Sequence, residues 1–75
     1  MKAYVLVTLE GSNEQNVFKK LESLKEVKDL HILFGEWDVI AELEIASSDE
    51  LGEFVMKNIR SLPEVKLTST MIVAK

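Results

Sequence analysis

The chain has 75 residues, which is enough for one domain, so we expect a single domain over residues 1–75. Such a short chain buries only about 60% of the surface that its unfolded form exposes, and small domains usually add disulfides, a metal or a partner subunit. The chain has no cysteine and one histidine, which argues against disulfides, thiolate metal sites and His-rich metal sites. The composition therefore favours oligomerisation, without a metal or cofactor.

The net charge of −4 argues against a nucleic-acid surface, which needs clustered Lys and Arg. The densest basic group, at residues 19–28, alternates with acidic side chains, as is typical of a solvated helix face. No apolar run approaches a membrane-spanning length, and no basic-then-apolar leader precedes the first expected strand. We therefore expect a cytoplasmic protein that does not bind membranes.

The first expected elements are a strand over residues 3–10 and a helix that ends near Lys25. The strand is apolar on both faces, with Val5, Val7 and Leu9 opposite Tyr4, Leu6 and Thr8. Ser12 or Asn13 can cap the helix, whose apolar residues recur at helical spacing: Val17, Phe18, Leu21 and Leu24. A strand that is apolar on two faces predicts that other parts of the protein, or a partner subunit, pack against both of its faces.

A β-hairpin is expected next, with strands over residues 27–34 and 37–45 and a two-residue turn at Gly35-Glu36. This register pairs apolar residues across the strands: Phe34 with Trp37, Ile32 with Val39, and Leu30 with Ala41. A four-residue loop through Asp38 would keep the same residues on each face of the hairpin. Either loop brings the apolar faces of the two strands together, as register selection requires.

Ser47 and Glu50 have the spacing of a capping box and predict a second helix, which Pro63 stops. The last strand is expected over residues 65–74. With right-handed crossovers, this order predicts an α+β, ferredoxin-like βαββαβ sandwich, related to dimeric α/β barrels. Its four-stranded antiparallel sheet has the strand order 4-1-3-2 and carries both helices on one face.

Two helices can cover only one face of four strands, which we expect to be the face with Val5, Val7 and Val39. The uncovered face then combines apolar and polar side chains: Tyr4, Leu6, Leu33, Ile40 and Ile72 with Thr8, Thr68, Thr70, His31, Glu42 and Glu44. A contiguous apolar patch of this kind usually marks an interaction site. It predicts a symmetric dimer in which two sheets pack face to face.

Two segments could bind a small molecule. In Gly35-Glu36-Trp37-Asp38, a carboxylate beside turn amides could hold the ammonium and carboxylate groups of a zwitterion, although Asp38 could equally bind backbone amides within the turn. In Thr68-Ser69-Thr70, hydroxyls could be presented on the uncovered face to a ligand carboxylate, although threonines are also common in ordinary strands.

His31 is the third candidate, because Glu42 or Glu44 is expected on the same face. A histidine near carboxylates could be a general base or a haem ligand, as in a small dimeric ferredoxin-like monooxygenase. A strand histidine at an interface is more common, and no positioned partner for a base is evident. We therefore expect that the protein is not an enzyme.

The order and spacing of these residues resemble one known family. An aliphatic strand is followed by Gly35, Trp37, Asp38 and Val39, and a helix leads to Pro63, Val65 and a Thr-x-Thr strand at residues 68–70. This pattern resembles the effector-binding (RAM, regulation of amino acid metabolism) domain of the Lrp/AsnC transcription regulators, from Ala3 to Val73. The resemblance implies dimers that assemble into tetramers, octamers or discs and bind amino acids between subunits.

By position, the resemblance implies an effector site formed by Gly35, Glu36, Trp37 and Asp38 with Thr68, Ser69 and Thr70, while Leu33 shapes the side-chain pocket. Asp38 would bind the ammonium group, and the threonines and loop amides would bind the carboxylate. Full-length regulators carry a helix-turn-helix domain, whereas the first strand here starts at Ala3. We therefore expect a stand-alone domain that senses an amino acid or co-assembles with a full-length regulator. A ligand-free oligomerisation module is the alternative.

Overall fold

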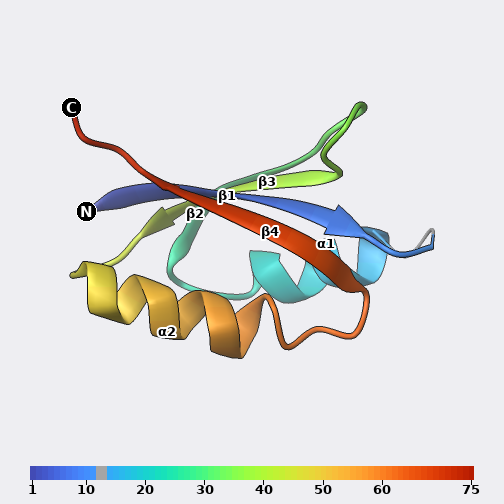
Figure 1. Ribbon diagram of the computed structural model, residues 1–75. Coiled ribbons are helices and arrows are strands. Elements are labelled where there is room, and N and C mark those ends of the chain that lie inside the picture. Colours follow the sequence, from blue (N-terminus) through green and yellow to red (C-terminus); the bar gives the residue numbers. More distant parts are fainter. Residues whose placement is uncertain (12–13) are drawn as a thin grey trace.

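The computed structural model describes residues 1–11 and 14–75 and contains six elements in the predicted order (Figure 1). They are β1 (Lys2–Leu9), α1 (Glu14–Glu22), β2 (Val27–Ile32), β3 (Val39–Glu44), α2 (Ser48–Asn58) and β4 (Val65–Ile72). The antiparallel sheet has the order β2-β3-β1-β4, and both helices lie on one of its faces (Figure 1). The predicted ferredoxin-like sandwich is confirmed. The predicted caps of α1, Ser12 and Asn13, lie outside the described residues.

The core lies between the sheet and the helices. Alternate residues of the two central strands are buried: Ala3, Val5 and Val7 on β1, and Val39, Ala41 and Leu43 on β3. The helices cover them with Val17, Leu21, Leu51, Phe54, Val55 and Ile59, which follows α2. All of these side chains are apolar, so the described part of the core is built by burial of hydrocarbon alone.

The second helix begins as its sequence predicts. Ser47 is extended, and its hydroxyl oxygen accepts a hydrogen bond from the backbone N–H of Glu50 at 3.2 Å. This bond satisfies one of the free amides at the helix start. The helix ends at Asn58, before Pro63, and the backbone N–H of Ile59 still donates to the carbonyl of Val55.

The hairpin register is confirmed, but its predicted two-residue turn is wrong. Ile32 pairs with Val39, whereas the backbone N–H of Leu33 donates to the carbonyl of Asp38 at 2.8 Å and closes a four-residue loop, 34–37. The cause lies at Asp38, whose backbone N–H donates to the carbonyl of Val7 at 2.9 Å and so fixes this residue beside the end of β1. Phe34 is fully exposed and does not pair with Trp37.

The predicted positions of Thr68, Thr70 and Ile72 on the uncovered face are wrong. Thr68 pairs with Val7, Thr70 with Val5 and Ile72 with Ala3, so these three residues face the helices. The β1–β4 register shifts between Thr8 and Leu9, which pair with Leu67 and Val65. Lys66 is the extra residue of this bulge and reverses the alternation of β4.

A side-chain hydrogen bond stabilises the bulge: the backbone N–H of Leu67 donates to the hydroxyl oxygen of Thr8 at 3.1 Å. The uncovered face, called the open face below, is therefore formed by alternate residues of the four strands: Lys2, Tyr4, Leu6, Thr8, Asp29, His31, Ile40, Glu42, Glu44, Leu67, Ser69 and Met71. Among the described residues, no helix is long and apolar enough to span a membrane.

Candidate functional site

The loop that carries Asp38 joins β2 to β3 and rises from the sheet on the side away from the helices (Figure 1). The carboxylate oxygen Oδ2 of Asp38 accepts a hydrogen bond from the backbone N–H of Leu9 at 2.7 Å. Because a carboxylate has two oxygens, Oδ1 can still accept a bond from a ligand. Asp38 therefore binds a backbone amide of β1 and not an amide within its own turn, and it retains one free acceptor.

The structure does not bring Asp38 together with Thr68 and Thr70 within one chain. Asp38 lies on the β3 side of β1, where its backbone binds Val7, whereas Thr68 pairs with Val7 from the β4 side. Thr68 and Thr70 face the helices, whereas the loop rises from the opposite side of the sheet (Figure 1). Ser69 pairs with Leu6 on the open face and is therefore separated from both threonines.

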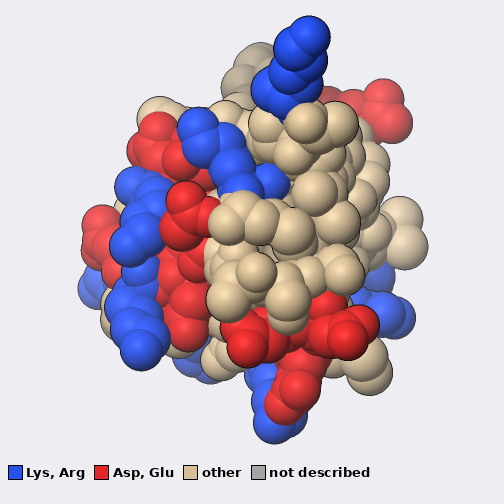
Figure 2. Space-filling model, turned by 90° about the vertical axis from the view of Figure 1, so that its left-hand side faces the viewer, with Lys and Arg blue, Asp and Glu red and all other residues tan. Residues whose placement is uncertain are grey.

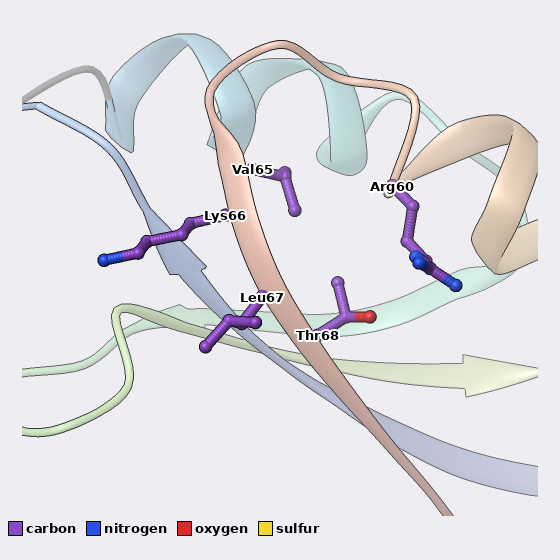
Figure 3. A pocket seen from close by; sticks show the side chains of 5 residues that line it. All are labelled: Arg60, Val65, Lys66, Leu67 and Thr68. Atoms are coloured by element: carbon purple, nitrogen blue, oxygen red, sulfur yellow. The ribbon is translucent and has the colours of Figure 1, made fainter.

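Thr68 and Thr70 line a groove between α2 and β4, called the α2–β4 groove below. Its volume is about 420 Å³, and its remaining lining residues come from α2 and the turn after it: Ser48, Leu51, Gly52, Val55, Met56 and Arg60. A second hollow of about 320 Å³ shares Arg60 and Thr68 and continues along β4 to Val65 (Figure 3). The two hollows therefore adjoin at Arg60 and Thr68.

Arg60 is the cation of this groove. Its guanidinium makes no hydrogen bond or ion pair within the described part of the chain. In Figure 3 the guanidinium and the Thr68 hydroxyl extend to the same side of β4, whereas the Lys66 side chain extends to the other side. The groove therefore offers a free guanidinium beside hydroxyl groups.

The predicted histidine site takes a different form. His31 faces Ile40 across the ladder, and its Nε2 lies 3.2 Å from the carboxylate of Asp29, not of Glu42 or Glu44. Both side chains of this pair are more than half exposed. Glu42 instead accepts a hydrogen bond from the Tyr4 hydroxyl at 3.3 Å. Within residues 1–11 and 14–75, no cluster of three or more His, Asp or Glu side chains could hold a metal ion.

Figure 2 shows the end of the molecule at which the two termini lie. Uncharged residues gather in the middle of this view, and acidic and basic side chains are interleaved around them. On this face, the basic residues do not form the continuous positive patch that binds a phosphate backbone.

A family model described as the Lrp/AsnC ligand-binding domain matches residues 2–75. The chain belongs to the Lrp/AsnC family. It is 29% identical over 73 residues to an uncharacterised HTH-type transcriptional regulator of Pyrococcus furiosus, and 27% identical to the HTH-type regulator FL11 of the same organism. These matches cover 93% and 97% of the chain and 49% and 48% of the two regulators. The chain therefore spans about half the length of these Lrp/AsnC relatives.

Two solved structures share the fold of this chain. The structure named FFRP-DM1 has a TM-score of 0.92 and 35% identity, with 96% of each chain covered. An L-Met complex of a Neisseria meningitidis transcriptional regulator has a TM-score of 0.87 at 18% identity; the match covers 99% of this chain and 49% of that protein, and it shows the shared fold.

The sequence alone missed the α2 side of the groove. Arg60, Gly52 and Met56 are not among the predicted site residues, because no local motif distinguishes them. They line a groove with Thr68 and Thr70 because these threonines of β4 face the helices, and this orientation results from the bulge at Lys66. No sequence signal could have found them, because the bulge depends on the tertiary bond from Leu67 to Thr8.

Proposed function

We propose that this Lrp/AsnC domain binds an amino acid at a site that two copies of the chain complete together. One copy supplies the loop with Asp38, and the other supplies Thr68 and Thr70. The observation that carries the proposal is the separation of these residues within one chain, where β1 lies between them. Since neither half encloses a ligand by itself, a second copy has to bring them together.

The open face favours association between copies of the chain, which is the first step towards such a site. Its exposed apolar side chains include Leu67 and Met71, at 59% and 45% exposure. Phe34 is fully exposed, and the loop 34–37 that begins with it rises on the same side of the sheet (Figure 1). Solvated apolar surface of this extent is typical of an interface between subunits. We infer that the sheets of two copies pack face to face, and that these dimers assemble further into tetramers, octamers or rings.

The residues of the two halves have complementary chemistry for an amino acid. The free Oδ1 of Asp38 would accept hydrogen bonds from the ammonium group, and the hydroxyls of Thr68 and Thr70 would donate to the carboxylate. The amides of Gly35, Glu36 and Trp37 would add donors, and Leu33 would border the ligand side chain. The ligand-binding description of the matching family model and the L-Met complex of the Neisseria regulator support an amino acid as effector.

A site shared between copies would let effector binding change the oligomeric state of the protein. A ligand between copies stabilises the assembled state, because it binds that state alone. We propose that the domain either buffers the amino acid or co-assembles with a full-length Lrp/AsnC regulator through the open face, and its similarity to HTH-type regulators supports the second role. The ligand-binding description of the family model and the regulator relatives support this reading over a monooxygenase.

Thermal unfolding in the presence of each of the twenty amino acids tests the proposal. A ligand at 100 times its Kd adds about 2.7 kcal/mol of stability, and the melting temperature should rise for one chemical group of amino acids. Glu36→Gln, which removes a carboxylate from the same loop, is the matched control for Asp38→Asn: only the Asp38 variant should lose the shift. If no amino acid raises the melting temperature while the oligomer stays intact, a ligand-free oligomerisation module is the correct description.

A further inference from the structure

The lining side chains of the α2–β4 groove are of two kinds. Leu51, Val55 and Met56 of α2 form its apolar part, called the apolar end below, and its polar side chains are Ser48, Thr68, Thr70 and Arg60, of which Arg60 alone is charged. Its volume of about 420 Å³ lies within the range of small-molecule sites, which combine an apolar lining with a few placed polar groups. This division matches a molecule with one anionic end and one hydrocarbon end.

Arg60 fits the anionic end. A guanidinium presents two parallel N–H donors that match the two oxygens of a carboxylate, and Arg60 has no protein partner in the described chain to compete with a ligand. The Thr68 hydroxyl, on the same side of β4, adds a neutral donor (Figure 3).

Gly52 leaves room at the apolar end. A Cβ atom built on Gly52 meets no heavy atom within 4 Å, so the helix surface is open at this position. Met56, one turn further along α2, is 64% exposed, and its flexible thioether adapts to the shape of a hydrocarbon ligand. The described lining residues of this end carry no charge that could bind a charged ligand side chain.

We infer that Arg60 binds the effector's carboxylate and that the α2 side of the groove selects amino acids with an aliphatic or thioether side chain. This inference rests on the proposed function and adds the specificity of the site for the side chain of the amino acid. Gly52 and Met56 then decide which amino acid binds, whereas Arg60 and Asp38 of another copy recognise the carboxylate and ammonium groups that all amino acids share.

Calorimetric titration with leucine and two of its analogues tests the role of Arg60. 4-Methylpentanoate lacks the ammonium group, and isopentylamine lacks the carboxylate. Arg60→Gln should lower the affinity for leucine and for 4-methylpentanoate by about 10- to 100-fold, and it should leave the weak affinity for isopentylamine unchanged. Lys66→Gln removes a neighbouring charge whose side chain extends away from Arg60, and it should bind leucine like the wild type.

Gly52→Leu tests the apolar end without removing a polar group. Because the new side chain enters open space, the protein should fold, lose leucine binding and keep glycine binding. Equal leucine affinities of the wild type and folded Arg60→Gln would overturn the inference, as would a wild type that prefers aspartate or lysine to leucine. In both cases an amino acid still binds, so the proposed function stands. Absence of binding by every amino acid would overturn both.

Discussion

The carboxylate of Asp38 accepts a hydrogen bond from the backbone N–H of Leu9 at 2.7 Å, although 29 positions separate the two residues. The backbone N–H of Asp38 also donates to the carbonyl of Val7 at 2.9 Å. Together these bonds fasten the β2–β3 loop to the end of β1. One side chain therefore stabilises the loop, and in our proposal it also binds the effector's ammonium group.

Two substitutions of Asp38 should separate these roles. Asp38→Ala removes the acceptor of the Leu9 amide, and we expect the free energy of unfolding to fall by about 1–3 kcal/mol. Asp38→Asn keeps an oxygen acceptor without the charge, so it should retain most of the stability and lose amino-acid binding. Urea denaturation and ligand titration measure the two effects. An Asp38→Asn variant that binds the effector like the wild type would contradict the ammonium role.

Phe34 should act on assembly and not on the fold of one chain. Because its side chain is fully exposed, Phe34→Ser should change the free energy of unfolding of one chain by less than about 0.5 kcal/mol. Burial of a phenylalanine contributes about 1.5–3 kcal/mol, so the dissociation constant of the oligomer should rise about tenfold or more. Sedimentation velocity over a concentration series measures this change. Phe34→Tyr keeps an aromatic ring and should assemble normally; unchanged assembly of Phe34→Ser would refute the role.

Gly52→Ala should stabilise the protein. Gly52 lies within α2, is exposed, and has no heavy atom within 4 Å of an added Cβ. Alanine restricts the unfolded chain more than glycine does, and the gain in an exposed helix is about 0.5–1 kcal/mol. Thermal unfolding should show a higher midpoint. A lower midpoint would mean that the backbone of α2 needs a glycine at this position.

The Glu53–Lys57 pair on α2 should contribute to stability only at intermediate pH. The Lys57 ammonium donates a hydrogen bond to Glu53 at 2.8 Å, which holds the pKa of the Glu53 carboxyl below its ordinary 4.5 and the pKa of Lys57 above its ordinary 10.5. The contribution is therefore lost as the pH falls through the folded-state pKa of Glu53, below 4.5, or rises through that of Lys57, above 10.5.

A double-mutant cycle with Glu53→Gln and Lys57→Met measures this coupling by urea denaturation. The coupling should be small and favourable at neutral pH, weaker in high salt, and absent in strong acid. Lys19→Met on α1 is the control, since the Lys19 side chain makes no ion pair within the described residues. A coupling that persists in strong acid would show that packing, not charge, connects the two residues.

The sequence predicted most of the fold because its elements have local signals. The alternation of apolar residues set the pairing of Ile32 with Val39, and Ser47 marked the start of α2. The face of β4 could not be predicted in this way. It depends on the bulge at Lys66, which is fixed by the bond from Leu67 to Thr8, a contact between residues far apart in sequence.

The same bulge explains what the sequence revealed about the site. The Asp38 loop and the two threonines stand out by residue type, so they could be named from the sequence. Their positions on opposite sides of the sheet, and the contribution of Arg60 to the α2–β4 groove, follow only from the reversed alternation of β4. The composite character of the proposed site is therefore a property of the tertiary structure.

A mixing experiment tests the shared site most directly. One variant carries Asp38→Asn, and the other carries Thr68→Val with Thr70→Val, so each variant alone should fail to bind the effector amino acid. After the two are co-refolded at equal concentration, random pairing should restore about a quarter of the wild-type sites, because some sites combine an intact loop with an intact groove. Calorimetric stoichiometry measures this recovery. No recovery in a mixture that assembles normally would contradict a site shared between copies.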